Sequence, residues 1–112
     1  MSAGKVKKRL AEMASARSGD KGNHANIGVV ANSELDYAVL VSRLTAIRVQ
    51  EHFQHLGVTR VERYELPAVA ALNFVLYDAL GGGASRSLRI DTQGKLLATS
   101  LLDLILVFDS PL

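Results

Sequence analysis

Short apolar or alternating runs of residues predict the strands of this chain. The run 25–31 is β-branched and apolar between turn residues, as in a buried strand, and the run 58–66 alternates apolar and polar residues. Pro67 ends the second run, because proline has no N–H for a central ladder. Residues 98–102 fit a helix or a strand. In chain order, strands are expected at 10–16, 25–31, 58–66, 85–91 and 104–107.

A helical period follows the strand at 25–31. Residues 32–33 are suitable helix N-caps. Leu40 and Leu44 begin an apolar stripe at helical spacing. The pattern reaches Gly57, a natural stop for a helix. It predicts either one long helix or two helices with a break near Thr45.

Glycine and polar residues mark the connections between these elements. A second helix is expected at 68–80, short and mostly apolar, and it ends at the glycines 81–83. Turn-forming residues predict a loop at 17–23 and a hairpin turn at 92–94. The resulting order of elements is β-β-α-β-α-β-β, or a close variant of it.

This order predicts an α+β architecture. Helices of this kind pack on one face of a sheet, and strands joined by helical crossovers follow the right-handed rule. We therefore expect a ferredoxin-like sandwich, a mixed β-sheet with two helices packed on one face. The other face has no helix left to cover it, so it is polar or buried against another subunit. A homo-oligomer or a larger partner protein is therefore expected.

Composition supports one folded domain over residues 1–112. Of the 112 residues, 48% are hydrophobic and 21% are charged, which is enough apolar material for a core. The net charge is only +2, and four basic residues gather in the lead-in 1–9, interpreted as a solvated tail. Residues 109–112 form a second short tail. Basic residues without interleaved aromatic ones do not favour a nucleic-acid partner.

The chain has no cysteine, which excludes disulfides, zinc–thiolate sites and thiol nucleophiles. This composition fits a reducing compartment. The first ten residues lack the apolar segment of a signal peptide. The longest apolar run, 101–108, contains Asp103 and is too short to cross a membrane. We therefore expect a cytoplasmic protein without a membrane partner.

The segment 17–26 carries the richest set of candidate site residues. Its two glycines allow a tight backbone with exposed N–H groups, and Arg17 and Lys21 beside them suit an anion such as phosphate or a carboxylate. Neither the P-loop spacing nor the Rossmann spacing is present. The alternative is a plain strand connection in which Asp20 and Asn23 cap their own backbone.

A second glycine cluster, 81–83, indicates close approach of a neighbouring loop or a ligand, because a helix end needs one such glycine at most. We expect the loops 17–23 and 81–83 to converge on one polar site. Arg86 follows on the next strand. Asn73 is expected inside an apolar helix, where a buried amide needs its hydrogen bonds made. Clamping a glycine loop is favoured for it over catalysis.

The histidines offer two further possibilities. His52 and His55 lie three apart on an expected helix, a spacing that metals can use. A solvent-facing helix explains them as well, so we expect no metal site and no cofactor. His24 flanks the glycine loop and, with Asp20 nearby, is a candidate general acid or base. No Ser–His–Asp arrangement can be established, and the catalytic residues are unknown.

Three blocks resemble the AtuA-like domain, a family named from acyclic terpene utilisation: ARSGDKGNHANIGVVA (16–31), RYELPAVAALNFVLYDALGGGASRSLR (63–89) and IDTQGK (90–95). The resemblance covers about 10–107 and implies a ferredoxin-like fold and a setting in terpene or branched acyl-CoA catabolism. It assigns no catalytic residues, and His24 departs from its pattern. The family motif falls on Arg17, Ser18, Gly19, Asp20, Lys21, Gly22, Asn23, Asn26, Asn73, Gly81, Gly82, Gly83 and Arg86.

Three functions are compatible with these features. The favoured one is an accessory or ligand-binding module for an anionic small molecule, such as an acyl-CoA or phosphate, held by the motif residues. The second is a small enzyme that acts on a branched acyl-CoA or hydroxy acid, with Asp20 or His24 transferring the proton. The third is a purely structural oligomerisation module. The isolated chain is not expected to be an enzyme.

Overall fold

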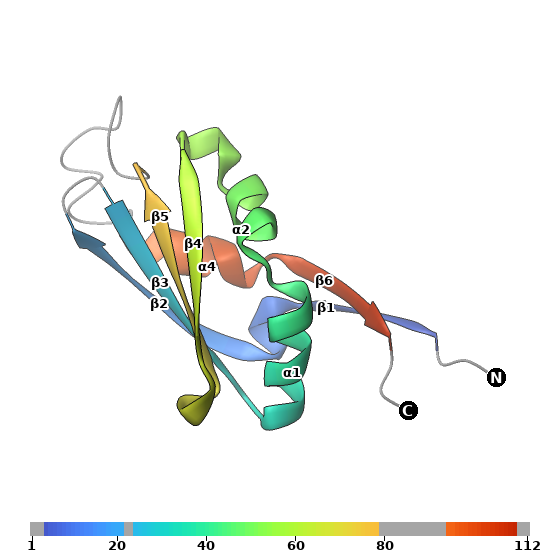
Figure 1. The fold of residues 1–112 in the computed structure, drawn as a ribbon. Coiled ribbons are helices and arrows are strands. Elements are labelled where there is room, and N and C mark those ends of the chain that lie inside the picture. The colour runs from blue at the N-terminus through green and yellow to red at the C-terminus, as the bar shows by residue number, and fades with distance from the viewer. Residues whose placement is uncertain (1–3, 22–23, 79–93, 110–112) are drawn as a thin grey trace.

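The computed structural model describes residues 4–21, 24–78 and 94–109. Their strands form a four-stranded sheet, in the order β2-β3-β5-β4, and a two-stranded ribbon of β1 and β6. Figure 1 shows the ribbon extending away from the sheet and the helices. The elements are β1 (Lys5–Arg9), β2 (Ala14–Lys21), β3 (His24–Ala31), α1 (Glu34–Arg43), α2 (Ala46–His52), β4 (Arg60–Leu66), β5 (Ala71–Tyr77), α4 (Gly94–Leu102) and β6 (Ile105–Asp109).

The strand order gives the four-stranded sheet its ferredoxin-like character. β3 and β4 each pair antiparallel with β5, so they run parallel to each other with β5 between them. Helices α1 and α2 make the crossover from β3 to β4. β2 precedes this unit in the chain and pairs antiparallel with the free side of β3. The expected ferredoxin-like α+β fold is confirmed, with antiparallel pairing at each ladder of the described sheets.

The first predicted helix is two helices, α1 and α2, with the break at the predicted place. Ser33 caps α1 by accepting a backbone N–H, and Thr45 Oγ1 accepts the N–H of Arg48 at 3.1 Å to start α2. Side-chain caps of this kind satisfy donors that a helix start leaves unpaired. Arg63 then donates to the carbonyl oxygen of Leu44 at 3.1 Å. Polar partners on both sides therefore stabilise the break.

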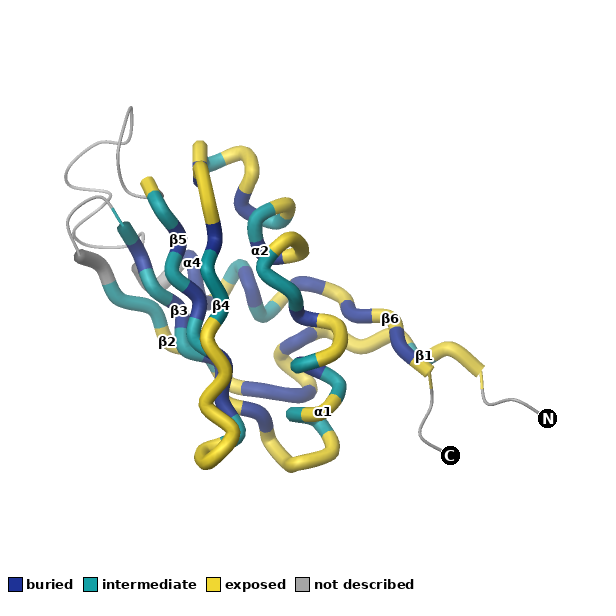
Figure 2. The backbone as a smooth tube through the Cα atoms, in the orientation of Figure 1, coloured by how far each residue is buried: buried dark blue, intermediate teal, exposed yellow. Residues whose placement is uncertain are grey.

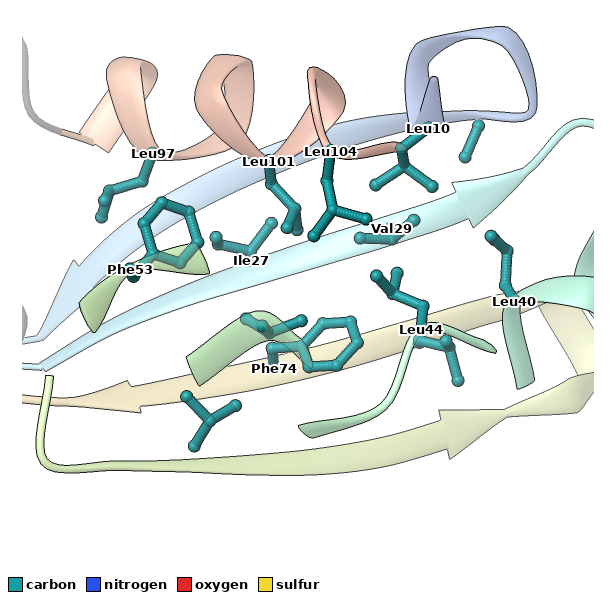
Figure 3. Packing of buried hydrophobic residues seen from close by; sticks show 14 of the residues in the cluster. Leu10, Ile27, Val29, Leu40, Leu44, Phe53, Phe74, Leu97, Leu101 and Leu104 are labelled. Carbon is teal, nitrogen blue, oxygen red and sulfur yellow. The ribbon is translucent and has the colours of Figure 1, made fainter. Parts of the chain in front are cut away.

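The core lies between the helices and one face of the four-stranded sheet. In Figure 3, Leu97 and Leu101 of α4, with Leu104 after it, lie over Ile27 and Val29 of β3, while Phe74 of β5 lies near Leu44 at the end of α1. Figure 2 shows the same division, with the buried positions gathered on the inner sides of helices and strands. The core residues that β3, β5 and the helices contribute include Ala25, Ile27, Val29, Leu72, Phe74, Leu76, Leu40, Leu44, Val49, Phe53, Leu97 and Leu101.

The segment 68–80 was expected to be a helix, and this prediction is wrong. Residues Ala71–Tyr77 form β5, which starts after a short 3-10 turn at Pro67–Val69. Alternate residues of β5 are fully buried against the helices, while those between them are half-buried. The segment is apolar almost throughout, and such a run does not distinguish a buried strand from a buried helix. Asn73 therefore lies on a strand and not inside a helix.

The segments 10–16 and 17–23 also depart from expectation. A 3-10 turn covers Leu10–Glu12, and β2 then runs through most of the expected loop. Because Lys21 pairs with His24, only residues 22–23 separate the paired ends of β2 and β3. Backbone pairing along β3 outweighs the turn preference of the glycine and aspartate in this segment.

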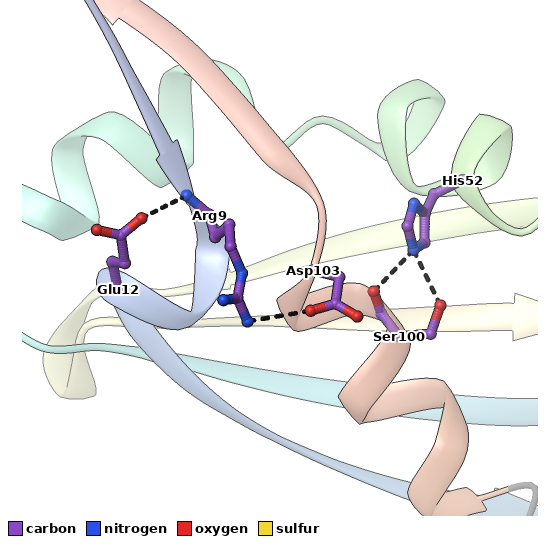
Figure 4. Close-up of polar contacts among 5 residues, drawn as sticks. All are labelled: Arg9, Glu12, His52, Ser100 and Asp103. Carbon is purple, nitrogen blue, oxygen red and sulfur yellow. Dashed lines mark hydrogen bonds and ion pairs between the residues drawn. The ribbon is translucent and has the colours of Figure 1, made fainter.

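The N-terminal lead-in was expected to be a solvated tail, but residues 5–9 form β1 and pair with β6. Figure 4 shows how this strand is fixed at its end. The N–H of Arg9 donates to Glu12 Oε2 at 2.9 Å, and its guanidinium binds Asp103 Oδ1 at 3.1 Å. At the other end of the chain, Asp109 belongs to β6 and not to a tail.

The ambiguous residues 98–102 belong to α4, which begins at Gly94. The expected strand at 85–91 and the first two positions of the turn at 92–94 lie outside the described residues. Within the described ranges, no helix has the length and apolarity that crossing a lipid bilayer requires.

Candidate functional site

The face of the four-stranded sheet that points away from the core is the candidate site. In the part of the chain that the structure describes, the helices pack on the opposite face (Figure 1). We call this surface the open face. Its side chains alternate with the buried ones along each strand. It includes Arg17, Gly19, His24, Asn26, Gly28, Val30, Asn73, Val75, Tyr77, Arg60, Glu62, Tyr64 and Leu66.

Two glycine–asparagine pairs lie side by side at the centre of the open face. Gly19 is the cross-strand partner of Asn26, and Gly28 is that of Asn73. The Nδ2 of Asn26 donates to Oδ1 of Asn73 at 3.5 Å, a long and therefore weak hydrogen bond. Because each glycine lacks a side chain, each amide has room beside its partner: a Cβ would lie 3.0 Å from Asn26 Oδ1 at Gly19 and 4.0 Å from Asn73 Oδ1 at Gly28. Most of the hydrogen-bonding capacity of the two amides remains available.

A hollow of about 250 Å³ lies over these amides. Its polar lining comes from the two asparagines and His24, and its apolar lining comes from Ala25, Val75 and the ring of Tyr77. An apolar concavity with a few convergent polar groups is the usual form of a small-molecule site. The residues that line it come from β3 and β5, the two central strands of the sheet.

His24 is held at one end of the hollow by its neighbours on β5. The backbone N–H of Asp78 donates to His24 Nδ1 at 3.1 Å, and the imidazole ring lies 4.9 Å from the ring of Tyr77. Asp78 has a left-handed backbone, with φ of 64°, and accepts a hydrogen bond from Thr59 Oγ1 at 2.7 Å. Since Nδ1 is an acceptor here, the neutral ring carries its proton on Nε2 and can donate there.

A second network fixes Tyr77 from the side of β4. The hydroxyls of Tyr64 and Tyr77 both donate to Glu62 Oε1, each at 2.8 Å. Arg60 lies 3.5 Å from Glu62 Oε2, and its guanidinium sits 4.1 Å from the centre of the Tyr77 ring. The hydroxyl of Tyr64, then that of Tyr77, lowers the pKa of Glu62 because both stabilise its charged form. The same contact with Glu62 raises the pKa of Tyr64.

Four of the predicted site residues meet on the open face: Arg17, Gly19, Asn26 and Asn73. Arg17 is exposed and is the cross-strand partner of Gly28, so it stands beside the two glycine–asparagine pairs. The expected anion nest of a loop is wrong in its geometry, because these residues lie on paired strands. The structure therefore brings some of the predicted residues together on one surface, although the sequence analysis did not predict that surface, and their role as a site stays a prediction.

The remaining predicted residues divide into three groups. Ser18 lies on the other side of β2, next to a separate hollow that is lined by Arg17 as well as by Ala98 and Thr99 of α4. Asp20 and Lys21 occupy the last positions of β2, paired with Ala25 and His24. Outside the described residues lie Gly22, Asn23, Gly81, Gly82, Gly83 and Arg86, so the expected convergence of the two loops stays a prediction.

The sequence analysis missed Arg60, Glu62, Tyr64 and Tyr77. Tyr77 was hidden by the prediction of a helix at 68–80, and the other three follow only from the register of β4 on β5. One sequence signal could have revealed the strand that carries Tyr77. Asn73, Val75 and Tyr77 alternate with larger apolar residues at a spacing of two, which is the period of a strand.

The two histidines considered for a metal have different surroundings. The Nε2 of His52 lies 2.9 Å from the carbonyl oxygen of Ser100 and 3.1 Å from its hydroxyl, which joins α2 to α4 (Figure 4). His55 is exposed in a 3-10 turn, Gln54–Leu56. Among the residues that the structure describes, no three His, Asp or Glu side chains are grouped to hold a metal ion.

Comparison with known proteins identifies the family. The model of the AtuA ferredoxin-like domain family matches residues 8–107. No curated protein and no solved structure matches the chain. The matched segment contains nearly all the described elements, including the glycine–asparagine pairs of the open face. The chain therefore belongs to the AtuA ferredoxin-like domain family.

Proposed function

We propose that this chain is a ligand-binding module that holds a small anionic molecule on the open face. The observation that carries the proposal is the pair of asparagine amides beneath a hollow of about 250 Å³, with a glycine beside each amide. Side chains at the two glycine positions would occupy the space around the amides. Glycine there leaves donors and acceptors accessible at the centre of a sheet, where a structural role alone does not require them.

Charge favours an anion in this hollow. Arg60 is already paired with Glu62 at 3.5 Å. By contrast, none of the ion pairs formed between described residues involves Arg17. The asparagine Nδ2 groups and His24 Nε2 add neutral donors. Arg17 does not line this hollow but borders a second one, between β2 and α4. Its guanidinium would therefore meet the charged end of a ligand from the margin of the open face, while the neutral N–H donors hold it in the hollow.

The size of the hollow restricts the ligand. Pockets that enclose drug-sized molecules measure roughly 300–1,000 Å³, so about 250 Å³ suits a small acid or one end of a larger molecule. The apolar lining from Val75 and Tyr77 suits a short hydrocarbon group beside the charge. A branched carboxylate, or the acyl end of its CoA thioester, has both features. Such ligands also fit the proposed role in terpene or branched acyl-CoA catabolism.

The hydrogen bonds of the open face favour binding over catalysis. The Nδ1 of His24 already accepts the N–H of Asp78. The hydroxyls of Tyr64 and Tyr77 both donate hydrogen bonds to Glu62. A general base needs a free lone pair within reach of the proton that it removes. These groups instead hold one another in fixed orientations, which suits recognition.

The test is a thermal-shift and calorimetric titration with phosphate, branched carboxylates, free CoA and branched acyl-CoA. A ligand at a hundred times its Kd stabilises the fold by about 2.7 kcal/mol, which raises the Tm of a domain this size by about 10 °C. The variants Arg17→Ala and Asn73→Ala should weaken binding at least tenfold. Lys8→Ala is the matched control, since it removes a positive charge from the ribbon and leaves the open face unchanged.

Two results would contradict the proposal. Absence of a shift with every compound would leave the open face without a small anionic ligand. Equal affinity in the parent chain and in both open-face variants would place the ligand elsewhere on the molecule. Circular dichroism of each variant separates loss of binding from loss of fold.

A further inference from the structure

The β1–β6 ribbon has two edges of opposite character. β1 carries Lys5, Lys7, Lys8 and Arg9, so a second strand of the same kind would meet like charges along the whole edge. β6 has the sequence ILVFD, with a single charge at its end. Charged residues protect exposed sheet edges from pairing with other chains. β1 has this protection and β6 does not.

Backbone hydrogen bonds show which groups of β6 face away from β1. The carbonyl of Leu104 accepts the N–H of Leu10 at 2.8 Å and so points toward β1. The carbonyl of Ile105 accepts from the guanidinium of Arg48 at 3.0 Å and points the other way. Because this direction alternates along an antiparallel strand, the N–H and carbonyl of Val107 point outward with those of Ile105. No hydrogen bond from the described residues occupies the outward groups of Val107.

There is space beside this edge for another strand. A hollow of about 400 Å³ runs along residues 105–107 and is bordered by Arg43 and Arg48 at the junction of α1 and α2. Ile105 is 51% exposed and Val107 is 43% exposed, although both belong to an apolar strand. Arg48 occupies the outward carbonyl of Ile105. Beside it, the edge combines the backbone groups of Val107, which no described residue binds, with two exposed aliphatic side chains.

We propose that two copies of this chain form a dimer by antiparallel pairing of their β6 edges about a two-fold axis at Val107. In this pairing Val107 lies opposite Val107 of the second copy, so their backbone groups exchange two hydrogen bonds. Ile105 lies opposite the partner's Asp109, which brings that carboxylate to the guanidinium of Arg48. The contact is self-complementary and closed, as two-fold contacts are.

The two edge strands of the four-stranded sheet, β2 and β4, are both more polar than β6, and β2 carries Arg17, Asp20 and Lys21. β4 presents alternating charges along its length, including Arg60, Glu62 and Glu65. Arg63 on the same strand donates to the carbonyl oxygens of Val41 and Leu44 at 2.8 Å and 3.1 Å. Charged residues therefore protect β2 and β4 from edge pairing, and β6 is the least charged of the described edge strands. The proposal is independent of any ligand on the open face.

The experiment is sedimentation equilibrium over a wide range of protein concentration. The parent chain should show a reversible monomer–dimer equilibrium. Val107→Pro removes only an outward N–H and leaves the ladder to β1 intact, so it should raise the dimer Kd about tenfold or more, since two intermolecular hydrogen bonds are lost. Val107→Thr keeps the N–H and the shape of the side chain, and it should retain the dimer. Val107→Lys places two positive charges at the axis and should abolish association.

Control variants make the result specific. Val69→Lys changes a residue that is 62% exposed but lies far along the chain from β6, and it should leave the dimer unchanged. A monomer at every concentration would overturn the proposal. So would a dimer that survives Val107→Lys and dissociates instead with Leu66→Lys, since Leu66 lies on the open face. If circular dichroism shows that Val107→Pro disturbs the fold, the effect of Val107→Lys on the dimer Kd tests the proposal in its place.

Discussion

The two faces of the four-stranded sheet are built from the same strands but differ in almost every property. On β3 and β5, Ile27 and Phe74 point to the helices and are fully buried, whereas Asn26 and Asn73 point to the open face and are half-buried. The covered face is apolar and buried against the helices (Figure 3). The open face combines glycines, amides and a fixed aromatic wall around a hollow. Packing on one face positions the polar groups of the other, so buried packing and exposed polar groups are divided between the two faces.

The largest expected effect tests this division on adjacent residues of β5. Phe74→Ala removes a fully buried ring from the core and should lower the free energy of unfolding by about 3–5 kcal/mol. Val75→Ala removes methyl groups from the half-buried lining of the hollow and should lower it by about 1 kcal/mol or less. Urea denaturation measures both. Losses of equal size would show that the open face is covered in solution and packed like the other face.

Some strands and helices of this arrangement can be predicted from the sequence because hydrophobic periodicity or a helix cap marks them locally, and others cannot. β3 follows from a β-branched apolar run between turn residues and β4 from alternation, and the break at Thr45 was one of the two alternatives for the helical stretch. β5 does not follow from its sequence, because an apolar run packs equally well as a strand or a helix until its neighbours are known. β2 was hidden by Gly19 and Asp20, whose turn preference is overridden by pairing with β3.

The candidate site also divides into residues that a local signal predicts and residues that only the strand pairing brings together. Arg17, Gly19, Asn26 and Asn73 were predicted because glycines and amides stand out in an apolar sequence. The contacts of Glu62 with Tyr64 and Tyr77 depend on the register of β4 on β5, and no local pattern contains that information. Residue types were therefore predictable, while the face that brings them together required the tertiary pairing.

A smaller effect is expected at the glycines of the open face. Gly28→Ala would place its new Cβ 4.0 Å from Asn73 Oδ1, an ordinary contact. Alanine restricts the unfolded chain, so this variant should raise the free energy of unfolding by about 0.4–1 kcal/mol. Gly19→Ala would place Cβ only 3.0 Å from Asn26 Oδ1, so it should gain less and displace that amide. Denaturation measures stability, and ligand titration reports the displacement. A clear loss of stability in Gly28→Ala would show that the glycine is needed for the fold rather than for space.

The smallest effect concerns the acid dependence of the open face. The two tyrosine hydroxyls hold the pKa of Glu62 below its ordinary value of 4.5 in the folded chain. A carboxyl group with a lowered folded pKa binds protons more readily in the unfolded chain. Its contribution to stability is therefore complete above the ordinary pKa and is lost as the pH falls through the lowered one. Because Glu62 is solvent-accessible, the change should be small.

Glu62→Gln should flatten the decline of stability below about pH 5, measured as urea midpoints across a pH series. Glu65→Gln is the matched control, since it removes a carboxylate from the same strand without touching either tyrosine hydroxyl. If both variants flatten the acid decline equally, the loss arises from the general charge of β4. If only Glu62→Gln does so, the tyrosine–glutamate network that fixes Tyr77 beside the hollow persists in solution. The open face is then an ordered surface, although no helix from the described residues packs on it.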